Sequence, residues 1–182
     1  MARLESERSA LVVVDVQERF RDLIHEMPAV IAGCSRLMRF CARLGIPALI
    51  TEQYPAGLGK TVAELAELVP EHTPLEKVAF SCCGDEGFAR AAGALGRDQF
   101  LICGIETHVC VYQTVRDLRA SGHQVAVAAD AVSSRRVRDR DAGLALMRDL
   151  GAQLMTVEMI LFDVLVRAGT REFKRVADIL KE

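Results

Sequence analysis

The segment from residue 101 to 118 carries the side chain with the clearest potential for chemistry, Cys110. A short apolar run leads into Gly104, a tight turn follows, and a helix begins whose first or second turn holds the cysteine. Such strand–turn–helix junctions are where open α/β sheets hold their reactive groups. The dipole and the unpaired N–H groups of a helix N-terminus favour the thiolate, which is the nucleophilic form of cysteine. We therefore predict a cysteine nucleophile, the alternative being that Cys110 is simply a small buried hydrophobic residue.

Two charged residues could assist this nucleophile. Asp15 ends a continuous β-branched run within residues 10–17, which is typical of a parallel strand buried on both faces. It would lie at the carboxyl edge of the sheet, where Cys110 also emerges, although an acid after a strand can be a mere helix cap. Lys77 is the second candidate. A lone lysine is usually a solvated surface charge, so only its combination with the acid and the thiol makes it a candidate.

The three side chains together indicate acyl transfer. Asp15 would take the proton of the thiol and later return it to the leaving amine. Because a carboxylate is a weak base for a thiol, we expect Lys77 to stabilise the charged groups and the helix N-terminus to lower the pKa of Cys110. The backbone N–H groups of Glu106 and Cys110 are the candidate oxyanion donors, because the turn from Gly104 brings them to one side.

Composition limits the class of protein. The chain has 182 residues, of which 51% are hydrophobic and 26% charged, as is ordinary for one globular α/β domain spanning residues 1–182. The formal net charge of -2 does not indicate a nucleic-acid partner. There is no long uncharged apolar stretch for a membrane helix, and the first residues lack the hydrophobic core of a signal peptide. We expect a cytoplasmic protein that acts on a small molecule and binds neither nucleic acid nor a membrane.

Strand-like runs alternate with helical segments along the chain. This alternation predicts a parallel sheet with right-handed crossovers, and hence a three-layer α/β/α fold with a mostly parallel, six-stranded, Rossmann-like sheet. No G-x-G-x-x-G pattern follows a strand, which disfavours a dinucleotide cofactor. The expected strands are 11–15, 46–51, 74–79, 99–103, 123–129 and 153–157, and the expected helices include 29–44, 62–68, 84–95, 136–150, 158–167 and 171–181.

The six cysteines contain no C-x-x-C pair, so a zinc ribbon or a thioredoxin-like site is excluded. Cys34 and Cys41 fall on one face of a helical stretch and are expected in the core, as is Cys103 within a strand. Cys82 and Cys83 closely follow Lys77. They could line the pocket, or they could be small side chains that only fill space beside a glycine.

Three motifs stand in a characteristic order: Val-Asp-Val-Gln at 14–17, Glu-Lys before Phe-Ser within 76–81, and Gly-Ile-Glu-Thr-His-Val-Cys at 104–110. Together they resemble the isochorismatase-like cysteine hydrolase superfamily, which includes nicotinamidases and N-carbamoylsarcosine amidases. Residues 51–59, Thr-Glu-Gln-Tyr-Pro-Ala-Gly-Leu-Gly, are similar in particular to the "isochorismatase domain-containing" branch, whose substrates are poorly assigned. Residues 130–135 resemble the family's segment after the fifth strand.

The resemblance implies a catalytic triad of Asp15, Lys77 and Cys110 and a non-proline cis peptide between Ile105 and Glu106. Nicotinamidases of the superfamily carry a metal-binding Asp-x-His pattern after the second strand, whereas residues here read Thr-Glu-Gln-Tyr. This departure argues against a bound metal and against nicotinamide as substrate, and we expect no cofactor. Isochorismatases proper lack the cysteine, so its presence disfavours ether hydrolysis of isochorismate.

His108 does not easily serve as the base for Cys110, because residues two apart on a helix do not face each other. We assign it to a pocket wall or an interface. The pocket is expected to be small. Its candidate wall residues, each of which could equally be ordinary packing, are Gln17, Phe20, Tyr54, Phe80 and Thr107.

The sequence thus predicts a hydrolase of a small-molecule amide or related C–N bond that works through a thioester on Cys110. One alternative is a thiol-redox enzyme in which Cys83 or Cys103 resolves the oxidised Cys110. Another is a catalytically retired family member that serves as a binding or scaffold subunit, against which the intact triad argues. We also expect a homo-oligomer, at least a dimer, because residues 159–166 are rich in apolar side chains, although these could instead cover the sheet.

Overall fold

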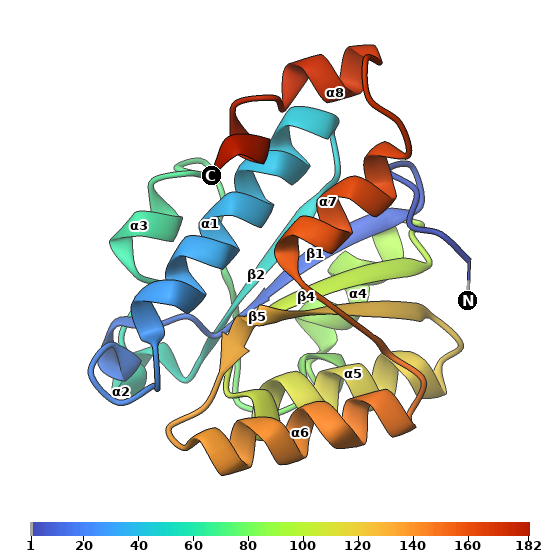
Figure 1. Ribbon diagram of the computed structural model, residues 1–182. Helices are drawn as coiled ribbons and strands as arrows, with labels where there is room; N and C mark the ends of the chain where they lie inside the picture. The colour runs from blue at the N-terminus through green and yellow to red at the C-terminus, as the bar shows by residue number, and fades with distance from the viewer. Residues whose placement is uncertain (1) are drawn as a thin grey trace.

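All six strands of the sheet run parallel, in the order β3-β2-β1-β4-β5-β6, and helices cover both faces (Figure 1). This computed structural model describes residues 2–182. It confirms the predicted three-layer α/β/α architecture with its six-stranded, Rossmann-like sheet. The strands are β1 (Ser9–Val14), β2 (Ala48–Gln53), β3 (Leu75–Lys77), β4 (Gln99–Ile105), β5 (Gln124–Ser133) and β6 (Gln153–Met155).

The helices form two layers, each with its own apolar cluster against the sheet. The longest, α1, shows how they arise: Val30, Cys34, Leu37 and Cys41 repeat at helical spacing and are buried, and Gly45 ends the helix in a left-handed conformation. One layer holds α1 (Met27–Leu44), α3 (Ala63–Ala66), α7 (Val157–Leu165) and α8 (Arg171–Arg175), the other holds α4 (Glu86–Ala94), α5 (Tyr112–Ala120) and α6 (Val137–Asp149), and the short α2 (Pro55–Leu58) follows β2.

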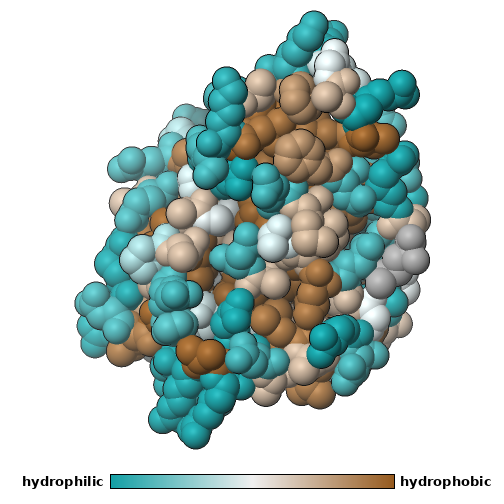
Figure 2. Space-filling model, in the orientation of Figure 1, coloured by the Kyte–Doolittle hydropathy of each residue, from teal (hydrophilic) through white to brown (hydrophobic). Residues whose placement is uncertain are grey.

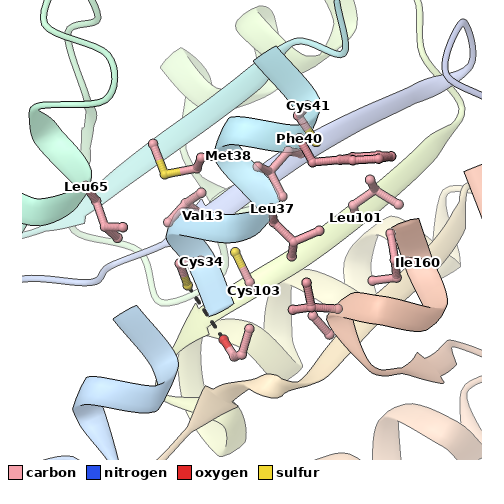
Figure 3. Packing of buried hydrophobic residues seen from close by; sticks show 14 of the residues in the cluster. Val13, Cys34, Leu37, Met38, Phe40, Cys41, Leu65, Leu101, Cys103 and Ile160 are labelled. Atoms are coloured by element: carbon pink, nitrogen blue, oxygen red, sulfur yellow. Dashed lines mark hydrogen bonds between the residues drawn. The ribbon is translucent and has the colours of Figure 1, made fainter. Parts of the chain in front are cut away.

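The centre of the sheet is fully buried. Every residue of β1 and of β4 is inaccessible to solvent or nearly so, as expected for β-branched runs between two helical layers. Figure 3 shows α1 packed on this part of the sheet, with Cys34, Cys41 and Cys103 inside the apolar cluster. The prediction that these three cysteines belong to the core is confirmed.

The strand order reverses between β1 and β4. From β1 the chain winds outward to β2 and β3, and from β4 it winds the opposite way to β5 and β6. Val14, the last residue of β1, is paired with Gly104 near the end of β4. Open α/β sheets bind ligands beyond the carboxyl ends of the strands at such a switch point. The segments after β1 and β4, which carry Asp15 and Cys110, therefore begin side by side.

Some element boundaries differ from those expected. β3 has three residues instead of six, because the chain turns after Lys77 and the carbonyl groups of Ala79 and Phe80 point back to that side chain. β5 continues beyond residue 129 to Ser133, since its ladder with β4 resumes after an irregularity. The expected helix 171–181 is α8 followed by a separate 3₁₀ turn, Ile179–Lys181.

On the face that Figure 2 shows, polar side chains lie mainly around the periphery and apolar side chains gather in several places between them. On α7, Met159, Phe162 and Val166 at its end are about half exposed, although the opposite face of the helix is buried. Within residues 2–182, no helix combines the length and the apolar character needed to cross a membrane.

Candidate active site

Asp15 lies directly after β1 and is held at both carboxylate oxygens. The hydroxyl of Thr51 on β2 donates to Oδ1 at 2.7 Å, and the ammonium of Lys77 donates to Oδ2 at 2.7 Å. The backbone of Asp15 has a φ of 52°, a left-handed conformation that aspartate adopts more readily than most residues. Asp15 is almost completely buried.

Lys77 reaches Asp15 from β3, two strands away. Its Nζ also donates to Oε1 of Gln53 at 2.7 Å and to the carbonyl oxygens of Phe80 at 3.2 Å and Ala79 at 3.3 Å. Burial by itself would lower the pKa of Lys77, but the charge and hydrogen bond of Asp15 together with the electrostatic effects of Cys82 and Cys110 outweigh it, and the pKa lies above its ordinary value. The side chain is therefore an ammonium ion at neutral pH, although it is only 1% exposed.

Cys110 lies in a single π-helical turn, Thr107–Val111, that leads into α5. Gly104 makes this connection possible: its φ is 114°, and a Cβ at this position would lie 2.1 Å from the carbonyl oxygen of Val14. The peptide bond between Ile105 and Glu106 is cis. The N–H groups of Val109 and Val111 both donate to the carbonyl oxygen of Glu106, which fixes the turn around the cysteine.

The thiol of Cys110 is protonated in this environment. Burial raises its pKa, the negative charge of Asp15 raises it further, and the positive charge of Lys77 offsets only part of the increase. The pKa of Cys110 therefore lies above its ordinary value, whereas we expected from the sequence that the helix N-terminus would lower it. The cysteine is 7% exposed and lies inside a π-helical turn, where desolvation of the thiolate exceeds any help from the helix dipole.

A cavity of about 110 Å³ joins Asp15 to Cys110. Lys77 binds Asp15 and is not part of the cavity wall. Of the predicted wall residues, Phe20 and Phe80 line this cavity. The complete lining is Asp15, Phe20, Gln53, Leu58, Phe80, Glu106, Val109 and Cys110.

The other predicted wall residues lie elsewhere. Gln17 is buried and ties the loop after β2 in place, since its amide donates to the carbonyl oxygens of Gln53 and Gly59 and accepts from the N–H of Gln53. Tyr54 is 57% exposed and borders a neighbouring hollow. Thr107 is buried at the start of the π-helical turn.

A model of the isochorismatase domain matches residues 9–159, which include the whole of this site. The chain belongs to the isochorismatase family. The resemblance noted from its motifs is thereby confirmed, and so is the likeness to the "isochorismatase domain-containing" branch. Isochorismatase domain-containing protein 2 of Danio rerio is 37% identical over 181 residues, which are 99% of this chain and 90% of that protein.

Two further relatives are of comparable similarity. The secreted isochorismatase effector Isc1 of Phytophthora sojae is 38% identical over 186 residues, covering 100% of this chain and 89% of the effector. The structure of the MAR1 ribonuclease from Caenorhabditis elegans has a TM-score of 0.93 and 37% identity, covering 100% of this chain and 93% of that one.

A second structure is that of YcaC from Pseudomonas aeruginosa with hexane-2,5-diol and covalent acrylamide. It has a TM-score of 0.89 and 25% identity, and covers 98% of this chain and 92% of that one. Membership of the isochorismatase family supports a hydrolase as the class of enzyme.

Several residues of this isochorismatase-family site were not anticipated from the sequence. Thr51 and Gln53 alternate on β2, point to the same side, and bind Asp15 and Lys77 respectively. Two polar side chains on one face of an otherwise buried strand were the available signal. Leu58 and Val109 line the cavity, but no sequence pattern distinguishes them from ordinary apolar packing.

The positions of the cysteines do not match the redox alternative, in which Cys83 or Cys103 would resolve an oxidised Cys110. Cys103 belongs to the apolar cluster on the α1 side of the sheet, whereas Cys110 belongs to the cluster on the α5 side. Cys83 borders a separate hollow beside α4. The cysteine that neighbours the charged pair is Cys82, whose Sγ lies 3.8 Å from the hydroxyl of Thr51. If a thiol were to resolve an oxidised Cys110, it would be this one.

His108 contacts Ser134, with 3.0 Å between Nδ1 and the hydroxyl oxygen, and not the catalytic candidates. In the part of the chain that the structure describes, no three His, Cys, Asp or Glu side chains are grouped as metal ligands. A larger hollow of about 290 Å³ lies on the other side of β2 and β3, around Glu52 and His72. It contains neither Cys110 nor Asp15, so the smaller cavity is the candidate active site.

Proposed function

We propose that this isochorismatase-family protein hydrolyses a C–N bond of a small amide or related compound, with Cys110 as the nucleophile. The observation that carries the proposal is the buried ion pair of Asp15 and Lys77, because its acid lines the same cavity as the thiol of Cys110. A buried ion pair is costly to maintain and adds little stability compared with apolar packing, so its position beside a nucleophile favours a role in catalysis.

In the acylation step, Sγ of Cys110 bonds to the amide carbon as its proton passes to the carboxylate of Asp15. The raised pKa of the thiol favours transfer of the proton together with attack over a thiolate formed in advance. The tetrahedral intermediate then collapses, the C–N bond breaks, and Asp15 returns the proton to the leaving nitrogen. This leaves a thioester on Cys110 and releases ammonia or an amine.

In the deacylation step, Asp15 removes a proton from a water molecule, which attacks the thioester carbon. The C–S bond breaks, the sulfur of Cys110 regains its proton, and the carboxylic acid leaves. Lys77 remains protonated throughout and keeps Oδ2 of Asp15 oriented. We assign the developing oxyanion in both steps to the backbone N–H groups of Glu106 and Cys110.

Two relatives bear on this assignment in different ways. YcaC of Pseudomonas aeruginosa is described with covalent acrylamide, an electrophile that alkylates nucleophiles such as thiols and keeps its amide bond, so it supports a reactive nucleophile in that protein and not amide hydrolysis. The MAR1 protein of Caenorhabditis elegans is named a ribonuclease. In the present chain a cavity lined by the two acidic side chains Asp15 and Glu106 does not favour a phosphodiester, so we propose no nucleic-acid substrate.

The direct test is a panel of small primary amides and ureido acids screened for ammonia release, with Cys110→Ala as the control. Release that disappears in the variant supports the proposal, and release that is unchanged contradicts it. The redox alternative predicts a disulfide after mild peroxide treatment, whereas the hydrolase predicts alkylation at a single site. A family member that has lost its catalytic activity and serves as a binding or scaffold subunit would release no ammonia from any compound.

We further propose that the protein is a homo-oligomer and that the exposed apolar side of α7, formed by Met159, Phe162 and Val166, contributes to the interface. We also propose a cytoplasmic location, because all six cysteines are free thiols, as is usual in a reducing compartment. One relative is named a secreted effector, so cell fractionation with an antibody is the test of this assignment.

A further inference from the structure

The charges around the candidate cavity are unbalanced toward the negative. The lining contains two carboxylates, those of Asp15 and Glu106, and no lysine, arginine or histidine among the residues that the structure describes. The charge of Asp15 is balanced by its ion pair with Lys77. The charge that remains at the cavity wall is therefore that of Glu106.

Lys77 is not available to a substrate carboxylate. An ammonium group has three hydrogens to donate, and four oxygen atoms already lie within hydrogen-bonding distance of its Nζ. The side chain is 1% exposed and is not among the residues that line the cavity. An anion in the cavity would therefore contact Asp15, which lines it, and not this cation.

Glu106 is paired with an arginine outside the cavity. Its Oε2 accepts from the backbone N–H and from Nε of Arg135, both at 3.1 Å. The side chain of Arg135 is 58% exposed, so solvent screens its positive charge, whereas the carboxylate of Glu106 is only 9% exposed. The pair therefore presents its negative end to the cavity.

The rest of the wall is apolar and the space is small. Phe20, Leu58, Phe80 and Val109 surround a volume of about 110 Å³. For comparison, an engineered apolar cavity of about 150 Å³ accommodates benzene. A branched acyl group of a few carbon atoms fits this space, and a charged group buried against these side chains would lose its hydration without gaining a partner.

We infer that the site accepts small uncharged amides whose acyl group is apolar, and that it discriminates against substrates carrying a carboxylate. This inference rests on the proposed function, because it concerns the substrate of the same cysteine. It separates the present chain from hydrolases of ureido acids and other anions, which need a cation within the pocket.

Three amides of the same shape provide the test. Isovaleramide, malonamide and malonamate share one arrangement of non-hydrogen atoms and differ in bearing an isopropyl, a carboxamide or a carboxylate group. We expect kcat/KM for ammonia release to fall in that order, with isovaleramide at least about 100-fold above malonamate. Equal rates, or faster release from malonamate, would overturn the inference while leaving cysteine-dependent hydrolysis intact.

A variant can supply the missing cation. Leu58 is a half-buried wall residue at the end of α2, and Leu58→Lys would extend an ammonium group along the cavity mouth. We expect the preference for isovaleramide over malonamate to shrink by about tenfold in this variant. Leu58→Met is the matched control and should retain the original preference. An unchanged preference in a correctly folded Leu58→Lys variant would count against the inference.

A second measurement does not depend on turnover. Iodoacetamide and iodoacetate have the same shape, and only the second is an anion. We expect iodoacetamide to alkylate Cys110 at least about tenfold faster than iodoacetate. This ratio of rates is divided by the ratio of the same two rates on Cys110 in unfolded protein, which corrects for the intrinsic reactivity of the reagents. A corrected ratio near one would overturn the inference. If no amide is hydrolysed but this ratio is high, the proposed function fails and the selectivity of the cavity stands.

Discussion

Asp15 and Lys77 are two opposite charges in a nearly dry part of the molecule, and each is stable there because the other is present. The pair is satisfied by further hydrogen bonds: Thr51 binds the acid and Gln53 binds the base. Removing one member of such a pair leaves an uncompensated buried charge, which typically costs about 3–5 kcal/mol. Both members must therefore be present for the fold to keep its stability, although the pair as a whole adds little stability compared with apolar packing.

The variant Lys77→Met tests both roles. We expect the free energy of unfolding to fall by about 3 kcal/mol, because Asp15 loses its partner, and ammonia release to disappear. Urea denaturation followed by circular dichroism measures the first effect. Lys174→Met, on the exposed side of α8, is the matched control and should change stability by less than about 0.5 kcal/mol. Equal stability of the two variants would show that the pair is not coupled to folding.

Asp15→Asn separates catalysis from reactivity of the thiol. The negative charge of Asp15 is one cause of the raised pKa of Cys110, so its removal should lower that pKa. Alkylation of Cys110 by iodoacetamide, followed from pH 6 to about pH 10, should therefore rise at a lower pH in the variant than in the wild type. Turnover should stop, because the proton acceptor is gone. Full turnover in Asp15→Asn would show that another group accepts the proton.

At the level of elements, the approach of β4 to β1 depends on Gly104. A Cβ there would lie 2.1 Å from the carbonyl oxygen of Val14, and the φ of 114° is unfavourable for any other residue. We expect Gly104→Ala to lower the free energy of unfolding by about 3 kcal/mol or more. Gly93→Ala in α4 is the control. It has open space around the new Cβ and should be neutral or slightly stabilising. Thermal unfolding of the two variants measures the difference.

The strands with the clearest apolar sequence patterns, and the residues at their ends, were predictable from the sequence. The β-branched run of β1 and the apolar run of β4 have no good alternative to buried parallel strands, so the positions of Asp15 and Cys110 followed. The short β3 was less clear, because its end depends on carbonyl groups that bind Lys77. The protonation state of the thiol was not predictable, since it depends on burial that only the folded chain defines.

The cavity wall could be predicted only in part for a related reason. Phe20 and Phe80 line the cavity, whereas Gln17 binds the backbone of the loop after β2. Which of these side chains turns toward Cys110 depends on the paths of the loops after β1 and after β3. Neither loop has a periodic sequence pattern from which its path could be predicted. Leu58 reaches the cavity through the short helix α2, which the sequence did not indicate.

At the scale of the whole molecule, the apolar side of α7 provides a test of assembly. We expect light scattering at micromolar concentration to give at least the mass of a dimer. Phe162→Glu should reduce the mass toward that of a monomer, because Phe162 is about half exposed between Met159 and Val166. Leu146→Glu, at a similarly exposed apolar position on α6, is the control and should leave the mass unchanged. A monomeric wild-type protein would contradict the proposed interface.

The central claim is that Cys110 carries the acyl group of the substrate, and mass spectrometry of the digested protein tests it most directly. The enzyme is mixed with isovaleramide, quenched in acid during turnover, digested and analysed. We expect one isovaleryl group on the peptide that contains Cys110, and no such adduct in Cys110→Ser. Ammonia release without any adduct on this peptide, or an adduct on another residue that persists in Cys110→Ser, would contradict the account.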